Sequence, residues 1–191
     1  MKSFLTTAGF ACMVCACATG RPDNFYVLSA EPQAVSTARS ATALQTSLKV
    51  TLPSLVDRPE ILLNTSPDGV MALEHERWAA PLADLVAQTL GRNLEIRRSD
   101  LLIAGQSVNR AGAASVNVAV DIVEVMVRRG QRASIETRWR IFDARSGKEA
   151  VGGDAFSAPV NTGGYADVAR ALSDCLSLLA DRLAGLIPRA E

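Results

Sequence analysis

Apolar and polar residues alternate along several short segments of the chain, which is the pattern of half-buried β-strands. Residues 48–52 alternate in this way, and Pro53 and Pro59 bracket a connection that cannot continue a regular strand. We therefore predict a strand that leaves its sheet at Pro53. Residues 31–47 are rich in Ala, Ser, Thr and Gln without a sustained apolar period, and this composition predicts a mobile loop.

A β-hairpin followed by a helix is predicted after this connection. Two short apolar runs, 61–63 and 70–73, flank the sequence Ser-Pro-Asp-Gly at 66–69. Proline presets φ and glycine accepts a positive φ, so this composition favours a tight turn. Pro81 then suits the first turn of a helix, and apolar residues follow it at helical spacing. We expect this helix to run from about residue 80 to about residue 93.

The strongest strand pattern covers residues 115–127. Its apolar residues occupy even positions up to Ile122 and odd positions from Val123, so the inward face changes within the strand. A β-bulge would reconcile the two halves, and a strand covered on both faces is the alternative. Residues 135–141 and 149–156 continue as strands around a turn at Ser146-Gly147, which gives three consecutive antiparallel strands. Shorter strands are predicted at 25–29 and 101–103, and a loop is predicted at 105–114.

The last predicted element is a helix from about residue 164 to residue 187. Leucine and valine recur along it at steps of three and four, and Pro188 ends it. Its apolar stripe needs a sheet to cover. The sequence therefore predicts the α+β class: an antiparallel or mixed β-sheet with two main α-helices packed on one face, in a single domain.

The N-terminus has the layout of a bacterial export signal. Lys2 is followed by an apolar segment that is too short to span a bilayer, and Val14-Cys15-Ala16-Cys17 resembles a lipobox. Cys17 fits best as the acylated residue. Cys15 and Cys12 place a bulky residue near the cleavage site, and a plain secretory signal is the remaining alternative. We predict a signal peptide at 1–16, a lipidated tether at 17–24 and the folded domain at 25–191, anchored by lipid to the periplasmic face of the outer membrane.

Composition and charge exclude several functions. Twenty basic and twenty acidic residues leave no net charge, and no basic run is long enough to bind nucleic acid. A single histidine, His75, rules out a multi-histidine metal site. It could act as a pH switch, but we favour a solvated surface residue. No nucleophile–base pair is recognisable, so we predict neither enzyme activity nor a cofactor. Cys175 is expected to be buried, and Gly152-Gly153 and Gly163-Gly164 are interpreted as turns.

The connection and the hairpin also carry a family resemblance. The sequence resembles the ABC-type transport auxiliary lipoproteins, the PqiC- and YmbA-like family associated with mammalian-cell-entry (MCE) systems. An aromatic pair followed by Val and Leu at 25–28 fits the same family. The residues that match its central motifs are Pro53, Leu55, Arg58, Pro59, Ile61, Arg77, Trp78, Ala79, Pro81 and Leu82.

This resemblance implies a function in envelope transport. The implied partners are an MCE-type periplasmic protein and ABC transporter subunits, which together move lipids or other hydrophobic compounds between membranes. A structural lipoprotein of another outer-membrane assembly, of the LptE-like kind, is the alternative, and a homo-oligomer is compatible with either. Asp57 and Arg58 are candidate partner-binding residues, although a local role in holding the loop is equally compatible with the sequence.

Overall fold

The computed structural model describes residues 21–32, 43–104 and 115–189. Within these ranges the chain forms, in order, β1 (Asn24–Tyr26), β2 (Leu44–Thr51), β3 (Glu60–Ser66), β4 (Gly69–Trp78), α1 (Leu82–Arg97), β5 (Leu101–Ala104), β6 (Val116–Arg128), β7 (Arg132–Asp143), β8 (Lys148–Pro159) and α2 (Tyr165–Leu186).

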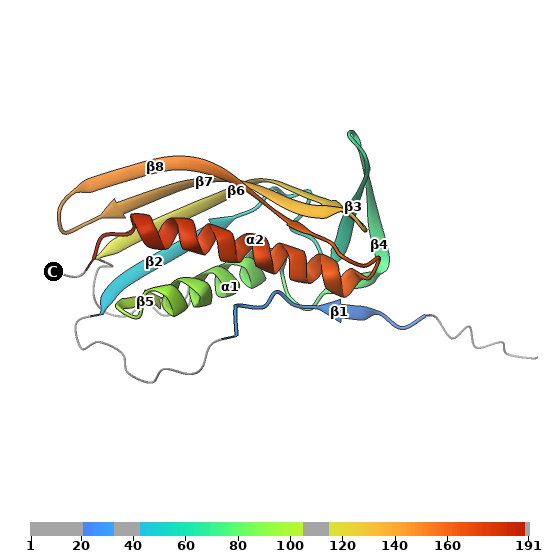
Figure 1. Cartoon of the computed structure of the whole chain (residues 1–191), viewed down its shortest axis with the longest axis horizontal. Coiled ribbons are helices and arrows are strands. Elements are labelled where there is room, and N and C mark those ends of the chain that lie inside the picture. The colour runs from blue at the N-terminus through green and yellow to red at the C-terminus, as the bar shows by residue number, and fades with distance from the viewer. Residues whose placement is uncertain (1–20, 33–42, 105–114, 190–191) are drawn as a thin grey trace, which may run out of the picture.

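The described strands form two sheets. The larger sheet has the order β5-β2-β6-β7-β8, in which β2 runs parallel to both neighbours and β6, β7 and β8 are antiparallel. The smaller sheet has the order β1-β4-β3, and its β3–β4 hairpin projects from one end of the molecule (Figure 1). Both helices lie on one face of the larger sheet (Figure 1). The predicted α+β class and mixed sheet are confirmed, with the hairpin in a separate sheet because the chain leaves β2 before Pro53.

The change of inward face in β6 is produced by a β-bulge, one of the two alternatives that the sequence left open. The register between β6 and β7 shifts between Ile122 and Glu124. Before the shift the even-numbered apolar residues are buried, and after it Val127 is buried instead. One extra residue therefore keeps apolar side chains inside along the whole strand.

Strands β7 and β8 confirm the predicted antiparallel meander but correct one interpretation. Gly152 and Gly153 lie inside β8 and do not form a turn. Gly152 pairs with Trp139 of β7, and a Cβ atom on Gly152 would lie 2.4 Å from the Trp139 ring. The glycine is needed because the indole ring crosses the neighbouring strand on the helix-facing side of the sheet. Gly163 and Gly164 do lie in the connection between β8 and α2.

The helix α1 extends beyond its predicted end at residue 93, because Gly91 does not terminate it. Gly91 instead allows close packing, since a Cβ atom there would lie 3.3 Å from Cγ2 of Ile103. The last turn is joined to α2 by Arg97, which donates to Ser177 Oγ at 2.6 Å. Arg98 donates to the carbonyl oxygens of Ala184 and Ile187 at the end of α2. Cations at this position satisfy carbonyl groups that the helix leaves unpaired.

The predicted loop at 31–47 is wrong for its last part. Residues 44–47 belong to β2, where Leu44 and Thr46 are buried between β5 and β6. The first part of β2 was missed because side-chain alternation alone does not define it. Hydrogen bonding to a parallel strand on each side extends β2 to Leu44. Residues 33–42 and the predicted loop at 105–114 lie outside the described residues.

One hydrophobic core connects both helices with the larger sheet. The large apolar side chains that α2 contributes include Val168, Leu172, Leu176, Leu179 and Leu183, all from the predicted stripe. Cys175 is fully buried in the same layer, and burial raises the pKa of its thiol to about 11. The predicted role of Cys175 as a small core residue is confirmed, since a buried neutral thiol is poorly reactive.

Candidate partner-binding surface

The two parts of the family motif, separated by the hairpin in sequence, meet at the base of the β3–β4 hairpin. The Trp78 backbone N–H donates to the carbonyl oxygen of Pro59 at 2.7 Å, and the N–H of Ala79 donates to Tyr26 at 2.8 Å. Between the prolines, Val56 N–H donates back to the Pro53 carbonyl at 3.0 Å. The residues 53–59 therefore form an ordered turn that is attached to the end of β4.

Asp57 contacts the start of α1. Its Oδ1 atom accepts a hydrogen bond from the Ala83 backbone N–H at 3.2 Å. Pro81, at the N-cap position, makes no side-chain hydrogen bond of this kind. Since the first N–H groups of a helix have no partner within it, the carboxylate of Asp57 supplies one from the preceding connection.

Arg58 begins a chain of alternating charges on the outer side of the smaller sheet. Its Nε donates to Glu60 Oε2 at 2.8 Å, and Arg77 Nη2 donates to the other carboxylate oxygen of Glu60 at 2.9 Å. The chain continues from Arg77 to Asp23, whose Oδ1 also lies 3.0 Å from His75 Nδ1. We call these five residues the charged chain.

Hydrogen bonding within the charged chain lowers the pKa of its carboxylates. The donors Arg58 and Arg77 lower the pKa of Glu60 to about 2. The hydrogen bond with His75 is the main cause of the lowered pKa of Asp23, and the bond with Glu60 raises the pKa of Arg77. Both carboxylates are therefore ionised across the physiological pH range.

The structure brings Asp57 and Arg58 to one corner but gives them different local contacts. Asp57 faces α1, whereas Arg58 faces β3, and the Arg58 side chain is still 43% exposed. These contacts support a local role for both residues, and their part in partner binding stays a prediction. Cys17 lies outside the described residues. His75 is a half-exposed surface residue, as favoured from the sequence, with Asp23 as its hydrogen-bond partner.

Sequence reasoning did not find Glu60 and Asp23 as members of this surface. One signal for Glu60 was available in the sequence, because residues 58 and 60 lie on the same side of an extended chain. The pairing of Glu60 with Arg77 depends on the register of β3 against β4, which contains a shift directly after Glu60. Asp23 was assigned to the tether, and its contacts to β4 arise only from parallel pairing of β1.

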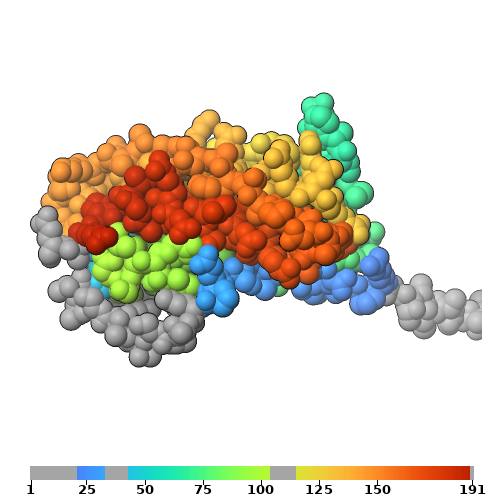
Figure 2. Space-filling view, viewed as in Figure 1, coloured from blue at the N-terminus to red at the C-terminus, as the bar shows by residue number. Residues whose placement is uncertain are grey.

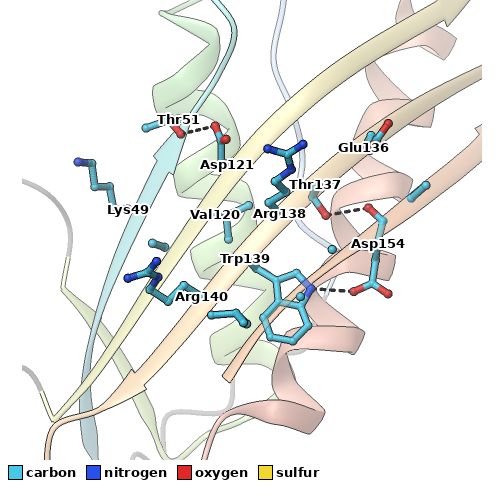
Figure 3. A pocket seen from close by; sticks show the side chains of 15 residues that line it. Lys49, Thr51, Val120, Asp121, Glu136, Thr137, Arg138, Trp139, Arg140 and Asp154 are labelled. Carbon is cyan, nitrogen blue, oxygen red and sulfur yellow. Dashed lines mark hydrogen bonds between the residues drawn. The ribbon is translucent and has the colours of Figure 1, made fainter. Parts of the chain in front are cut away.

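A second feature is an open hollow of about 860 Å³ over the outer face of the larger sheet (Figure 3). Lys49, Asp121, Arg138, Arg140 and Val151 line it together with small residues of β6 and β8. The charged groups here have partners: Asp121 accepts a hydrogen bond from the Thr51 hydroxyl at 2.7 Å, and Arg140 pairs with Glu149 at 3.3 Å. The hollow offers an open surface of apolar and polar groups without an enclosed cavity.

Neither region has the residues of a metal site. Among the described residues, no group of three or more His, Cys, Asp or Glu side chains is placed to hold a metal ion. Within the same residues, neither helix is long and apolar enough to cross a membrane. What the described surfaces can do chemically is form salt bridges, hydrogen bonds and apolar contacts with another molecule.

The fold defines a small two-layer α+β domain, and the surfaces described above carry charged and polar groups that can contact another molecule. The chain belongs to the family described as the ABC-type transport auxiliary lipoprotein component, which matches residues 26–184. Among curated proteins, no relative matches the chain.

Two crystal structures have a similar fold. One, of an uncharacterized protein, is 17% identical with a TM-score of 0.74, and the match covers 88% of this chain and 100% of the other. The second, of a protein from Xanthomonas campestris, is 16% identical with a TM-score of 0.66 and covers 85% and 93% of the two chains. At this identity the similarity establishes the shared fold.

Proposed function

We propose that this protein is a lipid-anchored auxiliary component of an ABC/MCE-type envelope transport system that moves lipids or other hydrophobic compounds between membranes. The observation that supports this proposal is the family match over residues 26–184. In this proposal an MCE-type periplasmic protein and the ABC transporter subunits are its partners, and it acts by binding without turnover of its own.

The proposed anchor is Cys17, acylated after removal of residues 1–16. Two or more acyl chains give lasting membrane attachment, each buried methylene contributing about 0.8 kcal/mol. Ala18 follows the cysteine, and we propose the outer membrane as the destination, with the folded domain on the periplasmic face.

The proposed docking surface consists of Asp57, Arg58 and the hairpin residues 61–73. Its connection is ordered by Pro53, Pro59 and the turn between them, so docking would cost little conformational entropy. Arg58 keeps part of its guanidinium exposed beside the charged chain and can donate several hydrogen bonds to a carboxylate or to backbone carbonyls.

Affinity purification from detergent-solubilised membranes, followed by mass spectrometry, tests the assignment. We expect an MCE-type protein and ABC transporter subunits to co-purify with the lipidated protein. Recovery of a different outer-membrane assembly, such as a lipopolysaccharide-export complex, would instead identify the LptE-like alternative.

Substitution Arg58→Ala tests the docking surface in the same purification. We expect the variant to remain lipidated and folded and to recover at least fivefold less MCE-type partner. Arg140→Ala is the matched control, because it removes an exposed arginine and its ion pair from the larger sheet. A stable Arg58→Ala protein that recovers the partner fully removes Arg58 from the docking surface, whereas a lower melting temperature with a proportional loss of partner indicates a local role alone.

A further inference from the structure

The segment around β1 presents two apolar side chains to solvent. Phe25 is 64% exposed and Val27 is 54% exposed. They are two residues apart in an extended segment and therefore point to the same side. Between them, Tyr26 points inward and packs against the hydrophobic core. We call Phe25 and Val27 the apolar strip.

The apolar strip is held in place by the residues on either side of it. Glu76 of β4 is buried, and its carboxylate accepts hydrogen bonds from Asn24 Nδ2 at 3.1 Å and from Tyr26 Oη at 2.6 Å. Further along, the Ser29 backbone N–H donates to Ser173 Oγ of α2 at 3.0 Å. The exposure of Phe25 is therefore a property of an ordered strand, fixed by a buried acceptor, and not of a frayed terminus.

Burial of Glu76 strengthens the attachment of β1 to β4. Removing a carboxylate from water is costly unless hydrogen-bond donors replace the water, and here the donors come from the two residues that flank Phe25. The pKa of Tyr26 rises to about 12, through burial and its bond to Glu76, so the hydroxyl stays a donor at neutral pH. The bonds of Asn24 and Tyr26 to Glu76 thus fix the outward direction of Phe25 between them.

The apolar strip also lies close to the proposed anchor along the chain. Only eight residue steps separate Cys17 from Phe25, which span at most about 27 Å when fully extended. Asp23 is bound to β4 through His75 and Arg77, and six residue steps, at most about 20 Å when extended, separate it from Cys17. If Cys17 is acylated, this edge of the domain cannot move far from the membrane.

From the strip and the short tether, we propose that Phe25 and Val27 contact the lipid surface and fix the orientation of the domain on the membrane. This inference rests on the proposed anchoring at Cys17. Apolar and aromatic side chains are favourable at the boundary between headgroups and acyl chains, where lipid replaces water around them. Figures 1 and 2 show this segment along one edge of the molecule, beside the helices and away from β8.

Contact at the apolar strip would also fix how the other surfaces of the domain are oriented relative to the membrane. In Figure 1, β1 lies along the lower edge of the molecule and β8 along the upper edge, so contact at β1 would hold β8 away from the membrane. The strip would thus give the anchored domain a fixed orientation, because a second contact with the membrane limits its rotation about the anchor.

Site-directed fluorescence on the mature, lipidated protein tests this proposal. Phe25→Cys and, separately, Val27→Cys are labelled with an environment-sensitive maleimide dye and reconstituted into phosphatidylethanolamine–phosphatidylglycerol vesicles. Val151→Cys is the matched control, since Val151 is also 64% exposed but lies on β8. Native Cys175 does not interfere, because it is buried and its thiol pKa is raised.

We expect blue-shifted emission at positions 25 and 27, with at least twofold quenching by lipids that carry a nitroxide near the headgroup, and neither effect at position 151. Labels at 25 and 27 that remain as accessible to water as the label at 151 would overturn the proposal. Protection that appears only after the co-purified partner is added, and not with vesicles alone, would also overturn it and assign the strip to a protein interface.

Flotation of the same vesicles separates this inference from the proposed function. Protein that does not float with lipid lacks the anchor, which contradicts the assignment of Cys17 and with it the premise of the strip. Protein that floats while the labels at 25 and 27 stay in water contradicts the strip alone. Circular dichroism of both variants checks that the fold survives, and agreement between positions 25 and 27 guards against a local effect of one substitution.

Discussion

At the scale of single residues, contacts between distant parts of the sequence decide what each side chain does. Trp139 donates from its indole nitrogen to Asp154 at 2.7 Å, and its ring lies against the backbone of Gly152 (Figure 3). Arg182 of α2 lies over the same ring, 5.9 Å from its centroid. Trp139 therefore connects two strands and a helix, and the absence of a side chain at position 152 makes its position possible.

We predict that Gly152→Ala destabilises the protein by about 1–3 kcal/mol, because the added methyl overlaps the Trp139 ring and forces it to move. Urea unfolding measures the change. Gly185→Ala is the control, since nothing lies within 4 Å of its Cβ position in α2 and alanine favours helix. Equal stability of Gly152→Ala and the natural protein would mean that the ring does not occupy this position in solution.

The lowered pKa of Glu60 predicts that the protein loses stability in acid. This pKa falls from an ordinary 4.5 to about 2 in the folded protein. A lowered folded-state pKa means that the carboxylate stabilises the fold above the unfolded value, and this contribution disappears as the pH falls from about 4.5 to about 2. Asp143 behaves in the same way, because hydrogen bonds from Arg145 lower its pKa to about 2.

We therefore expect Glu60→Gln to lose less stability than the natural protein between pH 5 and pH 2.5, measured by urea midpoints at several pH values. Its stability at pH 7 should be lower, because the ion pairs with Arg58 and Arg77 are gone. Glu149→Gln, which removes a carboxylate from the larger sheet, is the control. An unchanged pH dependence in Glu60→Gln would exclude Glu60 as a source of acid sensitivity.

At the scale of elements, the helices depend on groups outside themselves at their ends. The start of α1 is bound by Asp57, and the end of α2 is bound by Arg98, which leaves both helices attached to neighbouring segments. The end of α1 is similarly attached to α2 through Arg97. These contacts fix the two helices relative to one another and to the connection that precedes β3.

We predict that Asp57→Ala costs about 1 kcal/mol of stability, the usual loss when a side-chain acceptor at a helix N-terminus is removed. Asp57→Asn should retain most of the stability, because the amide oxygen can still accept the Ala83 N–H. Thermal and urea unfolding of both variants provide the measurement. If the two variants bind the partner equally and only alanine destabilises, Asp57 has a local role and does not contact the partner.

At the scale of the whole molecule, several features meet at one end of the domain. At this end β1 pairs with β4, and the motif residues converge. The apolar strip and the proposed docking surface both adjoin β4 or the hairpin that contains it. The larger sheet and its helices extend away from this end (Figure 1). Membrane attachment and partner binding would therefore act on the same small sheet, supported by the larger one.

We predict that Cys17→Ser leaves an unprocessed precursor in the inner membrane, because no thiol remains to accept diacylglycerol. Immunoblots of separated membranes, together with metabolic labelling by a fatty-acid analogue, show the processing state and location. Cys15→Ser is the control and should be processed normally. Normal maturation and outer-membrane location of Cys17→Ser would refute the assignment of the acylated residue.

Much of the fold follows from patterns that are local in the sequence. The hairpin around residues 61–73, the meander from β6 to β8 and both helices were predicted, because side-chain alternation, turn residues and helical spacing act over a few residues. The bulge in β6 was one of two alternatives that the sequence left open, since a change of inward face is visible in one strand. The family, too, was identified from local motifs.

Other features depend on which segments pair across the fold. The first half of β2 was missed because its neighbours β5 and β6 are distant in sequence, and Gly152 was interpreted as a turn because its partner Trp139 lies on another strand. The charged chain requires the register of β3 against β4 and the parallel addition of β1. The sequence by itself thus determined the elements and the family. Tertiary structure decided which side chains meet, because strand register and sheet order bring together residues whose local patterns contain no information about one another.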